Sequence, residues 1–294
     1  VRSRRQQFVT VSGRGYRRDV VRLGRWNLVV LAGAGLYCLV AFVLPMGVLI
    51  WRSLLSPFAE VTATGPFTFD AYERLIESPT VRSVVGNTLL IGVCTAVLVV
   101  LLANVIAWLS ARDRVRWSGF LDGLSFLGLG FPAIVIAVSM SLVFLYLPLP
   151  LYGTVWIIVI AMAARYLPYA VRVMSSAYIQ VAGTLEEASW TAGVGTLRTL
   201  WSVMLPLVWP SNARAFVWVF VHAIRDATIA IVLVSTANST YAASIWFTWF
   251  ESANYAYAAA LCVPLAVVSL LLTAVMNWRR RDPFDRRIVA HDRE

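Results

Sequence analysis

The sequence of 294 residues contains no lysine, because all 25 of its basic side chains are arginine. A nucleotide-binding P-loop needs the lysine of the GxxxxGK[ST] motif, and Schiff-base enzymes need a reactive lysine amine. The sequence therefore excludes a Walker-type ATP site and Schiff-base chemistry within this chain.

Residues that build metal sites and nucleophilic centres are also scarce. The three cysteines, Cys38, Cys94 and Cys262, lie in apolar runs without a CxxC pair, and the two histidines, His222 and His291, are far apart. Neither pattern has the spacing of a zinc site or a disulfide framework. GxSxG and HExxH motifs are absent too, so we predict no enzyme, no catalytic residue, no metal site and no bound cofactor.

Charged side chains make up only 14% of the chain, whereas 60% of its residues are apolar. Soluble domains average about 25% charged and about 45–50% apolar residues. The net charge of +10 is concentrated at the two ends and between long apolar runs, which favours a membrane over nucleic acid as the partner. Composition thus predicts a protein embedded among membrane lipids that binds no nucleic acid.

Long uncharged runs divide the chain into membrane-crossing segments. A helix needs about 20 apolar residues to cross the hydrocarbon layer. The sequence predicts an all-α membrane protein with six spans, at about residues 27–51, 83–111, 124–147, 154–175, 206–224 and 255–278. The first run lacks a signal-peptide cleavage site and is expected to remain a membrane helix.

The arginines indicate how these spans are oriented. Eight lie in the first 25 residues, three in the connection at residues 110–122 and six after Trp278, whereas the loop at residues 52–82 has four acidic residues against three arginines. Basic segments stay in the cytoplasm, so both termini are predicted to be cytoplasmic. The expected organisation is a basic arm (1–26), a six-helix domain (27–278) and a basic tail (279–294).

The longest cytoplasmic connection, at about residues 176–205, has the signals of two short helices. Residues 184–187, Thr-Leu-Glu-Glu, match a capping box, in which the threonine and the last glutamate cap each other's backbone amides. Gly193 then interrupts the first helix, and Thr196 caps a second helix that is expected to stop before Pro206. The segment is predicted to lie on the inner face of the membrane.

The same segment carries a longer motif: Glu187-Ala188-Ser189, three residues, Gly193, nine residues, then Val203-Met204-Leu205-Pro206. This spacing resembles the EAA loop of ABC importer permeases, with Ser189 in place of an alanine and Val203 in place of an isoleucine. The resemblance implies a MetI-like permease bundle whose cytoplasmic loop is a coupling helix that docks on a separate, ATP-binding ATPase subunit. The residues implied to couple are Glu186, Glu187, Ala188, Gly193, Leu205 and Pro206. The alternative is an ordinary amphipathic helix at the membrane surface.

Residues 67–72 and 85–90 resemble the outside helix and the entry to the second helix of this permease class. Residues 131–135, 152–156, 165–172 and 223–228 resemble the ferric-iron-type permeases within it. Such permeases commonly consist of two six-helix halves, and this chain resembles the C-terminal half. Residues 8–16 look like the linker between halves.

One six-helix bundle does not enclose a transport pathway, because it must pair its inner face with another. The resemblance therefore implies a second permease half, as a hetero- or homodimer. It also implies ATPase subunits, an extracytoplasmic binding protein and a bacterial cytoplasmic membrane. Ferric iron is the implied cargo, while polyamine, thiamine, phosphonate, sulfate and sugar remain open.

Charged residues at membrane depth are the remaining functional candidates, because such positions are costly. Arg165 lies deep in the fourth span, where it is expected to pair or to face the pathway, and Arg172 is expected to snorkel towards the cytoplasm. Arg225 and Asp226, at the outer end of the fifth span, form either a gate or a structural ion pair, of which the second is favoured. His222 is interpreted as an interior residue.

Two other classes of protein are weighed against the importer permease. A gradient-driven secondary transporter would need acidic residues within the spans, and only Asp226, near an end, meets this requirement. A membrane-embedded enzyme would need a nucleophile with a base or a metal, and neither is evident. Ferric iron prefers hard oxygen ligands, yet the spans show no convergent carboxylates or tyrosinates. Capture of cargo is therefore assigned to the external binding protein.

Overall fold

The computed structural model describes residues 24, 26–56, 67–111, 118–147, 150–181 and 183–278. Several parts of the sequence analysis concern residues largely or wholly outside these ranges. They are the basic arm and tail, the resemblance at residues 8–16, the arginines of residues 112–116 and His291. The chain divides into two compact units, residues 1–48 and 49–294, which are described separately.

All regular structure within the described ranges is helical, so the prediction of an all-α protein is confirmed. The helices are α1 (Trp26–Cys38), the π-helix η1 (Leu39–Val43), α2 (Leu44–Ser53), α3 (Asp70–Glu77), α4 (Pro79–Ala111), α5 (Ser118–Ser125), α6 (Leu127–Gly130), α7 (Ala133–Tyr146), α8 (Val155–Gln180), α9 (Thr184–Thr191), α10 (Thr196–Thr199), the π-helix η2 (Leu200–Met204), α11 (Leu205–Leu207), α12 (Trp209–Ile224), α13 (Ala227–Val232), α14 (Tyr241–Phe250) and α15 (Tyr255–Trp278).

Four helical stretches in the described chain are long and apolar enough to cross a membrane, at Trp26–Ser53, Pro79–Ala111, Val155–Gln180 and Tyr255–Met276. Two bent pairs meet the same test when each is counted as one span. These are Gly119–Gly130 with Ala133–Tyr146, bent by 105°, and Thr196–Leu207 with Trp209–Ile224, bent by 77°. The structure therefore has four to six candidate spans, and the number six stays a prediction.

The third predicted span is not the straight helix expected over residues 124–147. The helical path breaks between α6 and α7, where Phe131 is extended (φ −110°, ψ 135°) and Pro132 precedes the first residue of α7. Proline disfavours a helical conformation in the residue before it. The straight part is therefore α7 alone, which has 14 residues.

Two Leu-Pro pairs, Leu44-Pro45 and Leu205-Pro206, follow directly after the π-helical turns. The Leu44 amide donates to the Leu39 carbonyl, and the Leu205 amide donates to the Leu200 carbonyl. Proline has no amide hydrogen and crowds the carbonyl four residues back, and a π turn accommodates it because that carbonyl is already displaced from the α-helical pattern. The helix thus continues through Pro206, and the expected end before this residue is wrong. The 77° bend comes at Val208 instead.

In the first unit, α1 and η1 form an apolar helix that buries none of its side chains. A helix that is apolar on all sides suits a lipid environment. This agrees with the membrane helix predicted for the first apolar run.

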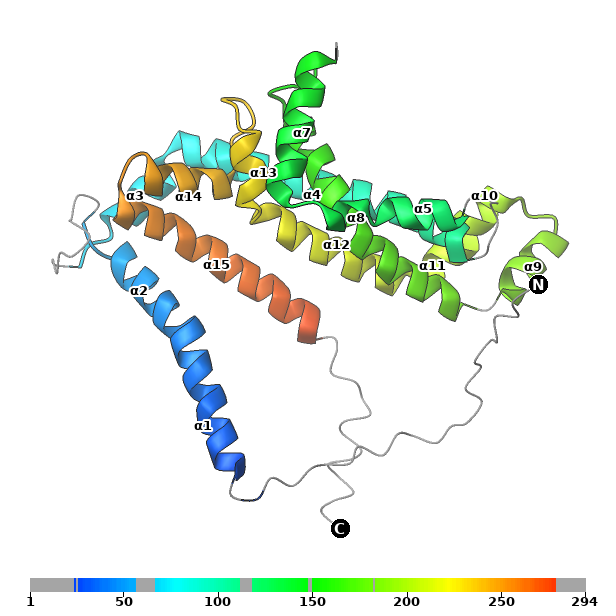
Figure 1. Ribbon diagram of the computed structural model, residues 1–294, viewed down its shortest axis with the longest axis horizontal. Coiled ribbons are helices and arrows are strands. Elements are labelled where there is room, and N and C mark those ends of the chain that lie inside the picture. Colours follow the sequence, from blue (N-terminus) through cyan, green and yellow to red (C-terminus); the bar gives the residue numbers. More distant parts are fainter. Residues whose placement is uncertain are drawn as a thin grey trace. The chain divides into compact units, whose positions relative to one another are not determined.

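In the second unit, α4 packs along both α8 and α12, and Figure 1 shows these helices running beside one another. Their contact faces are rich in small side chains, including Ala96, Ala103 and Ala161. A Cβ atom added to Gly92 of α4 would lie 2.7 Å from Cγ2 of Ile224, so α4 and the end of α12 meet too closely for a larger residue. Small residues permit this close approach in membrane bundles, where packing replaces the hydrophobic effect.

The two ends of this unit differ in their elements. Figure 1 shows α9 and α10 at one end of the bundle and α3 and α14 at the other. Helix α15 contacts α3, α12 and α14, and Val84, Tyr241 and Leu261 form a small separate core there.

Candidate functional site

The segment from α9 to α11 (residues 184–207) folds as the predicted helix, turn and second helix, but Gly195 and not Thr196 is the N-cap of the second helix. Its start differs from the prediction, because Gly183 is the N-cap and the Glu187 amide donates to the Gly183 carbonyl at 3.2 Å. Thr184 thus lies inside the first turn, and the predicted capping box is wrong. A backbone carbonyl takes the place that the sequence assigned to the threonine hydroxyl.

Gly193 ends α9 with a left-handed backbone, at φ +80°. Its amide donates to the Trp190 carbonyl at 2.8 Å, and the Val194 amide donates to the Ser189 carbonyl at 3.0 Å. These two bonds form a Schellman motif, for which glycine is the usual residue. A Cβ at this position would have no heavy atom of this chain within 4 Å, so within this chain the glycine provides a conformation and not a close approach.

Ser189, the residue that departs from the EAA pattern, connects the two short helices. Its hydroxyl lies 2.9 Å from Oγ1 of Thr199, and both side chains are buried. Because the Thr199 hydroxyl donates to the Gly195 carbonyl at 3.1 Å, Ser189 is the donor in the shared bond. The substitution therefore joins α9 to α10.

The six residues implied to couple do not share one face. Glu186 is buried, with 2% of its surface exposed, whereas Glu187, Ala188 and Gly193 are exposed. Leu205 and Pro206 lie in α11, at the opposite end of the segment. Only Glu187 thus presents a carboxylate outward from the first turn of α9.

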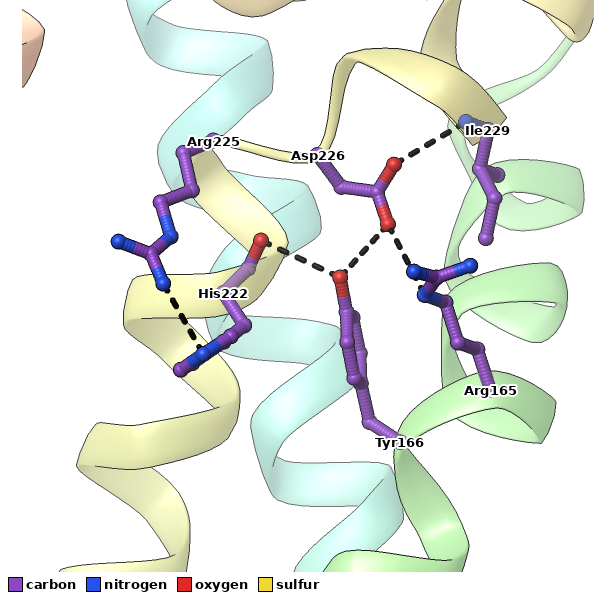
Figure 2. A network of polar contacts seen from close by, with 6 residues as sticks. All are labelled: Arg165, Tyr166, His222, Arg225, Asp226 and Ile229. Carbon is purple, nitrogen blue, oxygen red and sulfur yellow. Dashed lines mark hydrogen bonds and ion pairs between the residues drawn. The ribbon is translucent and has the colours of Figure 1, made fainter. Parts of the chain in front are cut away.

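A second polar site lies where α12 ends and α13 begins, and Figure 2 shows its residues. Asp226 is the N-cap of α13, since its Oδ1 accepts the Ile229 amide at 3.1 Å. Its Oδ2 accepts the Tyr166 hydroxyl at 2.6 Å and lies 3.5 Å from Nε of Arg165. The carboxylate side chain is 5% exposed and that of Arg165 is 36% exposed.

The structural ion pair favoured for Arg225 and Asp226 is wrong, because Arg165 of α8 is the partner of Asp226. Nη2 of Arg225 instead lies 3.0 Å from Nε2 of His222. Residues that are adjacent in the chain point apart here because α12 ends between them, so Asp226 enters the next helix. We call Arg165, Tyr166, His222, Arg225 and Asp226 the mid-span cluster.

Hydrogen bonds determine the protonation of His222. Its Nδ1 lies 2.8 Å from the Trp218 carbonyl oxygen, which can only accept, so Nδ1 carries the proton. Nε2 then accepts from Arg225, which makes the ring neutral. The ring stacks on Trp218 at 3.8 Å, and Trp218 stacks on Tyr169 at 3.6 Å. The interior placement predicted for His222 matches a ring that is partly buried in this stack.

A buried polar network that the sequence did not reveal joins α4, α8 and α12. Asn104 donates to Oδ1 of Asn212 at 2.6 Å and accepts the Tyr178 hydroxyl at 2.8 Å. All three side chains are buried. Each is an isolated polar residue in an apolar stretch, so only the packing of the three helices shows that they belong together.

The loop between α13 and α14 is held by two segments that carry the sequence resemblance. Asn87 of α4 donates to the carbonyls of Ala237 and Ser239, at 3.1 and 3.2 Å. From within the loop, the buried Asn238 side chain donates to the Thr154 carbonyl at 3.0 Å. Residues 85–90 and 152–156 therefore meet at one loop.

Residues 103–282 match the model of a protein family described as the binding-protein-dependent transport system inner membrane component. The chain belongs to this family. The matched region contains the α9–α11 segment and all five residues of the mid-span cluster. The predicted resemblance to ABC importer permeases is thereby confirmed.

Similar proteins include ferric transport permeases. The chain is 29% identical over 285 residues to the ferric transport system permease protein FbpB of Actinobacillus pleuropneumoniae, covering 93% of this chain and 40% of that protein. It is 29% identical over 248 residues to a putative ferric transport system permease protein of Haemophilus influenzae, covering 80% of this chain and 37% of that protein. The chain thus spans about two fifths of the length of these relatives.

A shorter relative matches along almost its whole length. The molybdate/tungstate transport system permease protein WtpB of Pyrococcus abyssi is 23% identical over 253 residues, which cover 86% of this chain and 95% of that protein. Among solved structures, a chain of a bacterial ABC transporter that imports alginate matches with a TM-score of 0.67 and 18% identity, covering 88% of this chain and 99% of that one. This likeness supports the fold.

Proposed function

We propose that the chain is the transmembrane permease subunit, or one half of it, of an ATP-binding-cassette importer. The observation that carries this proposal is the family match over residues 103–282. We place the protein in the bacterial cytoplasmic membrane as a multi-pass protein with six spans and both termini in the cytoplasm. The four to six candidate spans and the arginine-rich segments support this arrangement.

In this proposal the α9–α11 segment is the coupling element that docks on an ATPase subunit. The chain has no Walker lysine, so ATP is bound by that partner and this chain needs no cofactor. Glu187 and Ala188 are exposed on α9, and a carboxylate in the first turn is favoured by the helix dipole. Glu186, which is buried, acts inside the segment.

Coupling requires a segment that transmits force without bending. The Schellman turn at Gly193 and the Ser189–Thr199 bond give the segment this rigidity. Leu205 and Pro206 of α11 directly precede the bend into α12. A push on α9 would therefore reach α12 and, through its end, the mid-span cluster.

The importer also requires a second permease half and an extracytoplasmic binding protein. The chain spans about two fifths of the ferric transport relatives, which supports a partner half of similar size, and a single bundle does not enclose a pathway. A related solved structure is described as a complex with a substrate-bound periplasmic protein. This supports the binding protein as a partner.

Ferric iron is the proposed cargo, because two ferric transport relatives share 29% identity with the chain. Other small solutes are the alternative, since relatives named for molybdate/tungstate, 2-aminoethylphosphonate and sulfate transport match at 23–24% identity. A gradient-driven transporter is disfavoured because Asp226 is already committed to three donors.

The proposal is tested with the chain co-expressed with its ATPase, partner half and binding protein. Gly193→Val forces a β-branched residue into a left-handed backbone, which such residues rarely adopt. We expect it to insert and assemble normally, to retain ATP hydrolysis and to lose at least about tenfold in uptake.

Gly195→Val is the matched control, because Gly195 has φ −67° and ψ 156°, which suit valine. We expect uptake within about twofold of the wild type. Normal ATP-dependent uptake by Gly193→Val would contradict the coupling role, and failure of the chain to co-purify with any ATPase would contradict the importer.

A further inference from the structure

The mid-span cluster lies part-way along α8 and at the break between α12 and α13. Arg165 follows the start of α8 by ten residues, or about 15 Å at 1.5 Å per residue. Helix α12 has 16 residues, or about 24 Å, and stops short of the roughly 30 Å hydrocarbon thickness. Because Asp226 contacts Arg165, the break between α12 and α13 that holds Asp226 and Arg225 lies at the same depth as Arg165. Charged residues inside a membrane are costly and are usually functional.

The charge at this depth is positive. Arg165 and Arg225 contribute two guanidinium groups, Asp226 contributes one carboxylate and the His222 ring is neutral. The long helices α4, α7, α8, α12 and α15 contain no acidic residue, and every charged residue in them is an arginine. A cation crossing here would meet net repulsion, whereas an anion would be attracted.

Both guanidinium groups retain donors for a ligand. Arg165 meets Asp226 through Nε, at 3.5 Å, and its side chain is 36% exposed. Arg225 is exposed and uses one Nη for His222. Figure 2 shows the two arginines on opposite sides of the Tyr166–Asp226 contact.

The same site does not suit a bare metal cation. Asp226 already accepts from Tyr166, Ile229 and Arg165. The described residues contain no group of three or more His, Cys, Asp or Glu side chains that could hold a metal ion. Ferric iron prefers several hard oxygen ligands, and one committed carboxylate does not supply them.

We propose that the cargo crosses this subunit as an anion and that Arg165 and Arg225 bind it at mid-span. Guanidinium groups pair with oxyanions through charge-assisted hydrogen bonds. The ligand chemistry is an oxyanion, either free or as the chelator of ferric iron in a negatively charged complex. His222, held by Trp218, is a positioning residue that orients Arg225. This inference rests on the proposed function.

The test uses the complete importer in proteoliposomes with its binding protein and internal ATP. Uptake is measured for ³⁵S-sulfate, ⁹⁹Mo-molybdate, ⁵⁵Fe(III)-citrate and the cation ¹⁴C-putrescine. Comparing the two free oxyanions with the ferric chelate shows whether the transported anion is a free oxyanion or a negatively charged iron complex. We expect ATP-dependent uptake of at least one anionic probe and none of putrescine.

Variants of Arg225 then test whether this residue acts through its positive charge or only supports the local structure. We expect Arg225→Glu to lower anion uptake at least about tenfold, Arg225→Gln about threefold, and Arg225→Lys less than twofold because the charge is kept. A merely structural arginine would give equal losses in the Glu and Gln variants. Arg214→Glu is the matched control, because it makes the same charge change on the exposed surface of α12, eleven residues earlier.

Each outcome decides one proposal. Uptake of putrescine alone, or of no anionic probe, by a complex whose ATPase responds to the binding protein would overturn the anion inference and leave the importer standing. Equal uptake of the anionic probes by Arg225→Glu and the wild type would also overturn the anion inference and leave the importer standing. An ATPase that never responds to the binding protein would overturn the proposed function itself.

Discussion

The α9–α11 segment and the mid-span cluster are built in opposite ways. In the segment, the bonds that define its shape join near neighbours, such as Val194 to Ser189 and Ser189 to Thr199. In the cluster, Tyr166 and Asp226 are 60 residues apart and come from different helices. A structure whose bonds join near neighbours can be recognised as a motif in the sequence. A structure assembled from distant helices appears in the sequence only as single charged residues, and the sequence does not show which residues are their partners.

The largest expected effect is at Asp226. Asp226→Ala removes the nearer of the two acceptors of the Tyr166 hydroxyl, the other being the His222 carbonyl at 3.3 Å. It also removes the cap of α13 and the ion-pair partner of Arg165. Breaking a buried pair costs about 3–5 kcal/mol, and the partial exposure of Arg165 places this site at about 3 kcal/mol or slightly less. We expect lower thermal stability in detergent and faster hydrogen exchange in both α8 and α13.

Asp226→Asn is the companion variant, because it keeps an oxygen acceptor while removing the charge. We expect it to lose about half as much stability as the alanine variant. Equal stability of Asp226→Ala and the wild type would show that the cluster does not join the two helices.

A medium effect is expected in the buried network of Asn104, Tyr178 and Asn212. Tyr178→Phe removes the donor to Oδ1 of Asn104 and leaves that oxygen unsatisfied, at a cost of about 1–2 kcal/mol. Thermal unfolding of the purified chain measures this loss. Tyr146→Phe serves as the control, since Tyr146 is 83% exposed. An equal loss of stability in Tyr146→Phe would show that the effect of Tyr178→Phe does not come from the buried network.

The smallest effect is expected at Ser189. Ser189→Ala restores the alanine of the EAA pattern and removes the bond to Thr199, which keeps its bond to the Gly195 carbonyl. The cost is about 1 kcal/mol. Hydrogen exchange should rise only within residues 184–199, in contrast to the spread expected for Asp226→Ala. A rise in α8 as well would show that the segment is not a local unit.

The prolines show a feature that the sequence did not predict, namely whether a helix ends at a proline or continues through it. Pro132 ends a helix, whereas Pro168 and Pro264 lie inside α8 and α15, and Pro206 lies in a helix that follows a π turn. Each of these prolines looks alike in the sequence. Whether the chain breaks or continues depends on whether neighbouring groups take over the lost hydrogen bond, which is a property of the packed structure.

The sequence alone determined the helical class, the apolar runs, the lack of a Walker lysine and the helix–turn–helix of residues 184–207, because these follow from composition, length and local backbone preference. Only the tertiary structure decided that Asp226 belongs with Arg165 and not with Arg225, that Glu186 is buried while Glu187 is exposed, and that Asn104, Tyr178 and Asn212 meet. The physical reason is that a buried polar group pairs with the partner that packing places nearest, and the sequence of neither helix specifies the distance between the two helices.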